Sequence, residues 1–200
     1  MDLPAPPIGP SSPPPGLDAR LLEAAAAVLA EFGWDGLTQE RVAAQAGISR
    51  VTAWRQGATR DALVAALLDR LAADYQGALW PVLTAPGSGA HRLRLGLERL
   101  CDVADRHLAL LVASDRAFHR GFREEHGAAG INFIDPFARF MAEGVADGSL
   151  RHLDGDPGEA AEVVFNTVCW TYVHLRASHD LPPERARRIV IEIVTAGLAA

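Results

Sequence analysis

The sequence has no lysine, so all 19 of its basic residues are arginine. It has only two cysteines, Cys101 and Cys169, which lie too far apart to suggest a disulfide framework or a metal-binding motif. We expect both to be buried, inert thiols. No apolar run reaches the ~20 residues that cross a bilayer, and the first residues lack the basic segment and apolar core of a secretion signal. We therefore expect a soluble, cytoplasmic protein without a membrane partner.

The charge of the chain is negative overall but positive in one short segment. The formal net charge is −6, which argues against a protein that coats nucleic acid by bulk charge. Residues 38–60 contain one acid and four arginines, a net charge of +3: Glu40, Arg41, Arg50, Arg55 and Arg60. A local basic patch of this kind is typical of a protein that contacts DNA at a defined site.

The same segment, from Leu37 to Leu63, predicts a helix-turn-helix. Thr38 is a good N-cap for a first helix, because its hydroxyl can accept an otherwise unpaired backbone N–H. Gly47 stands where a left-handed residue would end that helix, and Ser49 can cap a short second helix over 50–55. The second helix of such a motif enters the DNA major groove. The first helix has apolar residues at helical spacing: Val42, Ala43 and Ala46.

The rest of the chain also predicts helices, and no strand-like alternation stands out. We therefore expect an all-α fold of about nine helices. Residues 1–16 contain more than half of the 13 prolines and predict a disordered arm. We expect a DNA-binding domain over 17–63 and a ligand-binding and dimerisation domain over 64–200. Outside the helix-turn-helix, the expected helices cover about 18–32, 60–80, 90–112, 115–125, 131–147, 156–178 and 183–198, with breaks at Gly33, at Pro81 and Pro86, and at the turn 147–149.

Several short segments resemble the TetR family of one-component transcriptional regulators. They are Ala25–Gly33, Leu37–Thr38, Val42–Ser49, Thr52–Trp54 and Arg60–Leu63. They cover about the first third of the chain, in the order helix, helix-turn-helix and long linking helix. The run Glu143–Leu153 (EGVADGSLRHL) is similar to a turn in the family's regulatory domain. The resemblance implies a homodimeric regulator, most often a repressor, that binds a pseudo-palindromic operator and is released by a small molecule in its C-terminal bundle.

The sequence departs from the family pattern just after the expected recognition helix. The family usually has Tyr, a variable residue, His or Tyr, Phe and then Lys, whereas this chain has Trp54, Arg55, Gln56, Gly57 and Arg60. We expect Trp54 to replace the Tyr as an amphipathic aromatic side chain, and Arg60 to replace the Lys as a phosphate contact. Gly57 removes a large apolar anchor between the recognition helix and the linking helix.

The candidate DNA contacts lie in or beside the helix-turn-helix. Arginine can bind guanine O6 and N7 in a bidentate way, so we expect Arg50 to contact a base edge and Arg55 a base or a phosphate. Short hydroxyl side chains at helix starts suit phosphate. The full set is Thr38, Ser49, Arg50, Thr52, Trp54, Arg55 and Arg60. Val51 and Ala53 are interpreted as packing residues.

The C-terminal part predicts two further surfaces. The resemblance implies a pocket for a small apolar or amphipathic ligand, and its candidate residues are Phe118, Phe122, Phe137, Met141, Trp170 and His174. Taken residue by residue, plain core packing explains the aromatic residues better, and the pocket is expected only because the resemblance implies it. The last two helices, about 157–178 and 183–198, have more apolar surface than the edge of a thin bundle needs, so we expect them to form the homodimer interface.

Two other function classes remain open. A helical enzyme has little support, because the sequence has no phosphate-binding glycine loop and no nucleophile elbow, and the acids Asp102 and Asp105 near His107 do not share one helix face. A protein-interaction module with a weakened DNA-binding domain is suggested by Gly57. We expect no catalytic residue, no cofactor and no metal. His119 and His126 could share a helix face, but glycines beside them weaken that helix.

Overall fold

The computed structural model describes residues 17–117 and 133–200. In this part of the chain there are nine helices, and the one β feature is an isolated bridge between Leu150 and Ala199. The expected all-α fold is therefore confirmed. The chain forms two compact units, residues 1–73 and 74–200, which are described one at a time. The expected Pro-rich arm and most of the expected helix 115–125 lie outside the described residues.

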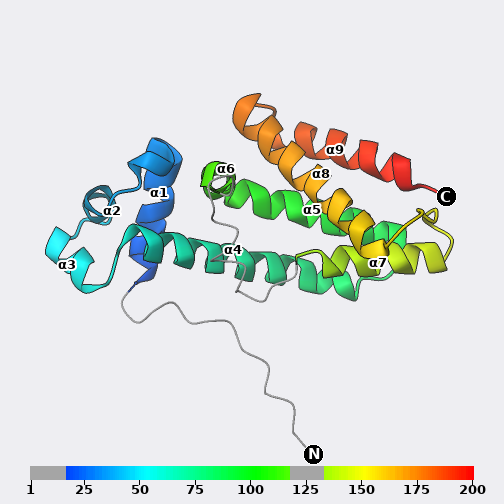
Figure 1. The fold of residues 1–200 in the computed structure, drawn as a ribbon, viewed down its shortest axis with the longest axis horizontal. Coiled ribbons are helices and arrows are strands. Elements are labelled where there is room, and N and C mark those ends of the chain that lie inside the picture. Colours follow the sequence, from blue (N-terminus) through cyan, green and yellow to red (C-terminus); the bar gives the residue numbers. More distant parts are fainter. Residues whose placement is uncertain (1–16, 118–132) are drawn as a thin grey trace, which may run out of the picture. The chain divides into compact units, whose positions relative to one another are not determined.

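The N-terminal unit contains three helices and the start of a fourth. They are α1 (Ala19–Gly36), α2 (Gln39–Gln45), α3 (Arg50–Arg55) and the first part of α4 (Arg60–Leu83), seen in blue and cyan in Figure 1. Asp18 caps α1, because its Oδ1 accepts the N–H of Leu21 at 2.9 Å. Gly33 has a φ of +66° and interrupts regular helix, as expected, although helical turns resume up to Gly36.

The helix α4 is longer than the sequence predicts. Thr59 caps it, since its Oγ1 accepts the N–H of Ala62 at 3.2 Å. The expected break at Pro81 is wrong, because α4 continues through Pro81 to Leu83. A proline removes one N–H from a helix, and here the carbonyl left without a donor belongs to Gly77. Gly77 is exposed, so water can reach that carbonyl and the helix tolerates the proline.

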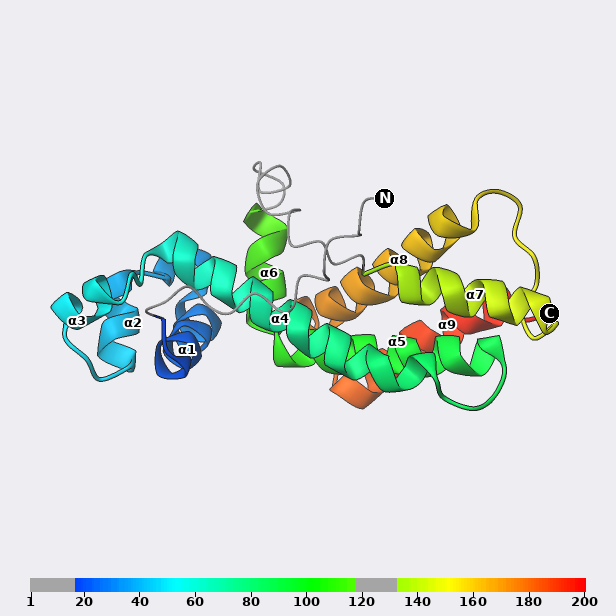
Figure 2. The same cartoon turned by 90° about the horizontal axis from the view of Figure 1, so that it is seen from below.

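The C-terminal unit is a bundle in which α5, α7, α8 and α9 lie side by side (Figures 1 and 2). Its helices are α5 (Gly89–Arg106), α6 (Leu108–Ala117), α7 (Asp135–Ala146), α8 (Pro157–Ser178) and α9 (Pro183–Leu198). The expected continuous helix 90–112 is wrong, because His107 is the C-cap of α5 and a new helix, α6, begins after it. The expected helix 131–147 starts later, at Asp135, with Pro136 in its first turn.

The run 143–153 joins the start of α5 to the end of α7. A Cβ placed on Gly89 would lie 2.0 Å from the backbone nitrogen of Gly144, so the two helices touch through their backbones. Asp147 Oδ2 accepts the N–H of Gly89 at 2.7 Å, and Ser149 Oγ accepts the N–H of Ala90 at 3.1 Å. The glycine and the acid of this run are therefore required by close packing and by capping of α5.

Candidate functional site

The helix-turn-helix is built by two similar helix ends. At the end of α2, Gly47 has a φ of +65°, and the N–H of Ile48 donates to the carbonyl of Ala43 at 3.0 Å. This is the hydrogen-bond pattern of a Schellman C-cap, for which glycine is the best residue. The next helix is capped at once, because Ser49 Oγ accepts the N–H of Thr52 at 3.0 Å. The turn predicted between α2 and α3 is thus present.

The two hydroxyl candidates at the start of α3 hydrogen-bond to each other. Ser49 Oγ and Thr52 Oγ1 are 2.8 Å apart, and both side chains are exposed. Thr38 has the equivalent place at the start of α2, where its Oγ1 accepts the N–H of Arg41 at 3.3 Å. Thr38 and Ser49 are therefore N-caps in this structure, whereas Thr52 lies in the first turn of α3. All three hydroxyls lie at helix N-termini, where phosphate binds well.

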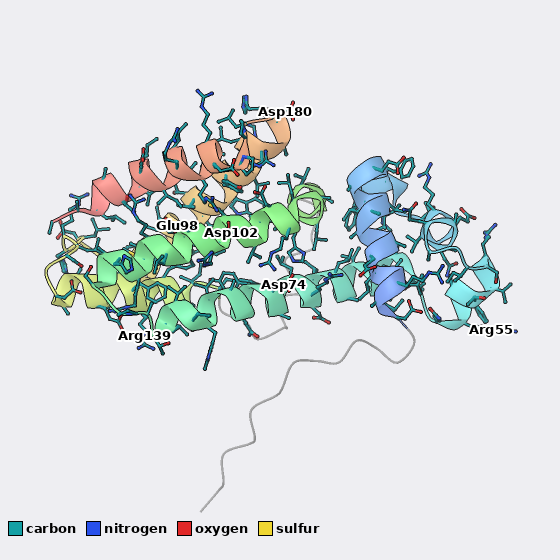
Figure 3. The ribbon with its side chains drawn as sticks, turned by 180° about the vertical axis from the view of Figure 1, so that it is seen from behind. Arg55, Asp74, Glu98, Asp102, Arg139 and Asp180 are labelled. Carbon is teal, nitrogen blue, oxygen red and sulfur yellow. The ribbon has the colours of Figure 1, made fainter. Side chains whose placement is uncertain are left out.

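The outer face of α3 is large, basic and partly apolar. Trp54 is 71% exposed and Val51 is 58% exposed, whereas Ala53 on the opposite side is fully buried. Arg50 and Arg55 are exposed on the same short helix, and Arg55 projects from it in Figure 3. The interpretation of Val51 as a packing residue is therefore wrong, because its side chain faces outward with the arginines. This face offers both hydrogen-bond donors and apolar groups.

Arg50 forms an ion pair with Glu40 of α2. The Arg50 side chain is 71% exposed and that of Glu40 is 56% exposed. An exposed ion pair contributes only ~0–1 kcal/mol, because water and salt screen it. Glu40 is therefore a weakly bound partner of Arg50. The sequence contains this acid within the basic segment, but nothing in its spacing identifies it as the partner of Arg50.

Arg60 is engaged inside the N-terminal unit. Its guanidinium carbon lies 4.4 Å from the centre of the Trp34 ring, and its Nη2 donates to the Trp34 carbonyl oxygen at 2.5 Å. This contact ties the start of α4 to the end of α1 by a cation–π interaction and a hydrogen bond. The expectation that Arg60 contacts phosphate stays a prediction, and any such contact would use the remaining donors of a side chain that is already fixed.

Gly57 ends the recognition helix in the same way that Gly47 ends α2. Its φ is +71°, and the N–H of Ala58 donates to the carbonyl of Ala53 at 3.0 Å. No atom lies within 4 Å of a Cβ placed on Gly57, so a Cβ would meet no steric clash there. The position is a left-handed cap, and the expectation that Gly57 removes an apolar anchor stays a prediction.

The expected ligand residues are only partly brought together. Phe118 and Phe122 lie outside the described residues. Phe137 is fully buried and Met141 is 7% exposed, one turn apart on α7. Trp170 is half-buried on α8, while His174 is exposed and lies against His179. Of the four described candidates, Phe137 and Met141 share the inner face of α7 and His174 faces outward.

An aromatic cluster that the sequence analysis missed surrounds Phe137. Its ring centre lies 5.8 Å from that of Phe165 on α8, and Phe165 in turn lies 6.5 Å from Tyr75 on α4. Tyr75 donates its hydroxyl to the carbonyl of Phe133 at 2.5 Å. Burial, helped by the nearby Cys169, raises the pKa of Tyr75, so its hydroxyl remains a donor at neutral pH. Tyr75 continues the apolar stripe of the linking helix one turn beyond Leu71, which is the signal that could have identified it.

The candidate acid–base group of α5 separates into ion pairs with different helices. Asp102 pairs with Arg187 of α9, and Asp105 accepts the Tyr172 hydroxyl and the Arg176 Nε of α8. Figure 3 shows Asp102 on α5 and Asp74 on α4. His107 binds Asp74 of α4, with 2.8 Å between Nε2 and Oδ2. These groups therefore connect helices and do not converge on one reacting atom.

The two cysteines have the buried environment that the sequence predicts. Cys101 and Cys169 are both buried, and burial raises the pKa of Cys169 to about 12, so the thiol stays protonated.

The outer face of α8 and α9 exposes large apolar side chains. Val163 of α8 is 64% exposed and Ile193 of α9 is 69% exposed. They line a groove of about 520 Å³ between the two helices, together with Arg151, Glu159 and Val194. Apolar side chains therefore remain uncovered on α8 and α9 of the single chain.

In the residues that the structure describes, no three side chains of His, Cys, Asp or Glu gather as a metal site would require. His119 and His126 lie outside those residues. Among the described helices, none has the length and apolar character that crossing a membrane requires.

Comparison with known proteins identifies the N-terminal domain. Residues 21–67 match the family model of bacterial regulatory proteins of the tetR family. No curated protein matches the chain by sequence. The matched segment runs from α1 through α3 into α4, so the chain has the helix-turn-helix domain of the TetR family and the predicted resemblance is confirmed.

The fold of the chain is also similar to solved structures of regulators. The ketosteroid transcriptional regulator KstR2 of Mycobacterium tuberculosis has a TM-score of 0.72 at 20% identity, over 92% of this chain and 98% of that one. AibR in complex with isovaleryl coenzyme A and operator DNA has a TM-score of 0.68 at 16% identity, over 86% and 95%. A TetR/AcrR-family regulator from Thermobifida fusca has a TM-score of 0.64 at 18% identity, over 89% and 96%. At these identities the likeness shows the fold.

Proposed function

We propose that this protein is a ligand-responsive transcriptional repressor that binds a pseudo-palindromic DNA operator as a homodimer. The observation that carries the proposal is the exposed face of α3, where Arg50, Trp54 and Arg55 project from a capped helix-turn-helix. That helix belongs to the segment that matches the TetR family. The net charge of +3 over residues 38–60 supports docking on phosphate in an otherwise acidic protein.

We assign different tasks to the side chains of this face. Arg55 lies in the last turn of α3 and is exposed, so it can reach a base edge or a phosphate. Arg50 contacts a base edge after it exchanges Glu40 for DNA, an exchange that costs little because the ion pair is exposed. Trp54 packs against sugar or a thymine methyl group, and Thr38, Ser49 and Thr52 bind phosphate from helix starts.

The ligand in this proposal is a small apolar or amphipathic molecule held by the C-terminal bundle. The aromatic cluster of Tyr75, Phe133, Phe137 and Phe165 supports it, because apolar walls with a few polar groups are typical of such sites. Phe118, Phe122, Met141 and Trp170 remain further candidates, whereas His174 is exposed and faces outward. AibR, which binds isovaleryl coenzyme A and operator DNA, has the same fold and gives a precedent for this pairing of ligands.

The contact between Asp74 and His107 is our proposed link from the ligand to the linking helix. His107 stands where α5 ends and α6 begins, and its side chain is only 9% exposed. It binds Asp74 on α4, and Tyr75 beside that residue belongs to the aromatic cluster. A ligand that repacks the cluster would therefore shift α4 between two arrangements, in proportion to its difference in affinity for them. We expect His107→Ala to alter operator affinity in the absence of ligand.

The homodimer in this proposal forms through α8 and α9. Val163 and Ile193 expose apolar surface there, and a two-fold dimer would place two recognition helices on half-sites about one DNA turn apart. We expect Ile193→Arg to give a monomer in analytical ultracentrifugation. Val145→Arg is the matched control, because Val145 is an exposed apolar residue of α7, away from that face. A dimer that survives Ile193→Arg unchanged would contradict this interface.

The test of the function is selection from DNA. The purified full-length protein is incubated with fragmented genomic DNA near physiological salt, because binding falls steeply with salt, and the retained DNA is sequenced. We expect a palindromic motif whose half-sites are about one helical turn apart. If a folded protein retains no motif, the alternative of a protein-interaction module replaces this proposal.

A further inference from the structure

Two histidines face each other where α8 ends. His174 lies in the last turns of α8 and His179 is its C-cap residue. Their Nε2 atoms are 3.2 Å apart, their ring centres are 4.9 Å apart, and the rings are inclined at 78°. Both side chains are exposed, so a small ion can reach them from solvent. Neither residue takes part in the helix-turn-helix or in the aromatic cluster.

The turn after α8 fixes this arrangement. Asp180 has a φ of +49°, a left-handed conformation that reverses the chain directly after His179, and it lies at that turn in Figure 3. The N–H of Leu181 closes the turn by donating to the carbonyl of Leu175 at 3.1 Å. Arg176 donates to the Leu181 carbonyl and also to Asp105 of α5. The backbone that carries both histidines is therefore held from two sides.

We propose that His174 and His179 form a binding site for a divalent transition-metal ion of the zinc type, held by both Nε2 atoms. Imidazole nitrogen is a common ligand of Zn²⁺, Ni²⁺ and Cu²⁺. Two Zn–N bonds of ~2.0–2.1 Å at a near-tetrahedral angle place the nitrogen atoms roughly 3.2–3.4 Å apart. The same geometry places the two ring centres about 5 Å apart. Both separations in this structure agree with one ion bound by the pair.

The site offers two protein ligands and leaves the other positions to water. No third His, Cys, Asp or Glu joins the pair among the described residues, so the coordination is open on the solvent side. An ion bound there connects the last turns of α8 to the residue that starts the turn toward α9. It binds the folded turn more tightly than the unfolded chain, so it stabilises this end of the bundle.

The experiment is a titration of the full-length protein with Zn²⁺ alone, in a buffer that does not chelate metals, followed by NMR of the imidazole groups. We expect the signals of His174 and His179 to shift together and to saturate near one equivalent of Zn²⁺. His91 and His152 are internal controls, because both are exposed histidines outside the pair. We expect their signals to stay in place at that concentration.

Calorimetry with variants tests the same site independently. We expect His174→Ala and His179→Ala each to weaken this binding step by about 10- to 100-fold, since one ligand of a converging pair is lost. His152→Ala should leave it unchanged. The proposal is wrong if the paired signals do not move first, or if both variants bind like the parent. In that case the 3.2 Å contact is only a hydrogen bond between two imidazole rings.

Discussion

Replacement of Gly57 by alanine tests whether this residue is a helix cap. Gly57 has a φ of +71°, and left-handed backbone costs a residue with a Cβ about 1–2 kcal/mol. Alanine also reduces the entropy of the unfolded chain, which returns about 0.4–1 kcal/mol. No steric clash adds to this, because no atom lies within 4 Å of the new Cβ. We expect Gly57→Ala to lower the free energy of unfolding by about 0.5–1.5 kcal/mol.

Gly77 provides the matched control for this substitution. It lies inside α4 without a left-handed φ, it is exposed, and a Cβ there also meets no atom within 4 Å. Alanine is a better helix former than glycine, so Gly77→Ala should raise the free energy of unfolding by about 0.5–1 kcal/mol. The two substitutions are chemically identical and differ only in the backbone conformation at the site.

The assay is urea unfolding followed by circular dichroism. Opposite shifts of the midpoint for Gly57→Ala and Gly77→Ala are the predicted result. A Gly57→Ala protein whose free energy of unfolding equals or exceeds that of the parent would refute the interpretation of Gly57 as a helix cap. Gly57→Phe extends the test to function, because restoration of the family's aromatic residue should weaken operator binding. An increase in affinity would show that an aromatic side chain at this position anchors the recognition helix.

Three further predictions concern charge and packing. Glu40→Gln frees Arg50 from its ion pair, so binding to unrelated DNA should increase in a fluorescence anisotropy titration, while an unchanged affinity would exclude a competing role for Glu40. Gly144→Ala should destabilise the bundle by about 1–3 kcal/mol in urea unfolding, because the new Cβ would lie 2.5 Å from the Leu150 side chain. A neutral effect would mean that the Leu150 side chain moves aside. Hydrogen bonds from Arg139 and then Arg92 lower the pKa of Glu143 below its ordinary 4.5. The stability that this carboxylate contributes is therefore lost as the pH falls through the lowered pKa. Glu143→Gln should reduce this loss in thermal unfolding measured between about pH 6 and pH 3.

Local chemistry explains what the sequence predicted correctly in the N-terminal unit. Thr38 and Ser49 cap helices, and Gly47 ends one, because a hydroxyl or a missing Cβ acts within a few residues. The same helix boundaries place Arg50 and Arg55 on α3, where both are exposed. The left-handed conformation of Gly57 was not predicted, because the comparison with the family pattern considered only the missing side chain.

Long-range contacts explain what the sequence could not predict. His107, at the end of α5, binds Asp74, which is 33 residues away, and the cluster around Phe137 depends on Tyr75 and Phe165 from two other helices. Helical periodicity places such residues on an inner face but does not say which faces meet. His174 has apolar neighbours in the sequence and still points to solvent for the same reason.

The most direct test of the proposed DNA-binding role of α3 measures how much Arg55 contributes to operator affinity. The operator recovered by selection is titrated with the parent protein, with Arg55→Ala and with Arg94→Ala, an exposed arginine of α5 that serves as control. If Arg55 contacts a base, we predict that Arg55→Ala weakens binding by about 1–3 kcal/mol. If Arg55 contacts a phosphate, the slope of the logarithm of the binding constant against the logarithm of salt concentration should decrease by about one. Arg94→Ala should bind like the parent. Equal affinity and equal salt dependence for all three proteins would contradict a DNA-binding role for the face of α3.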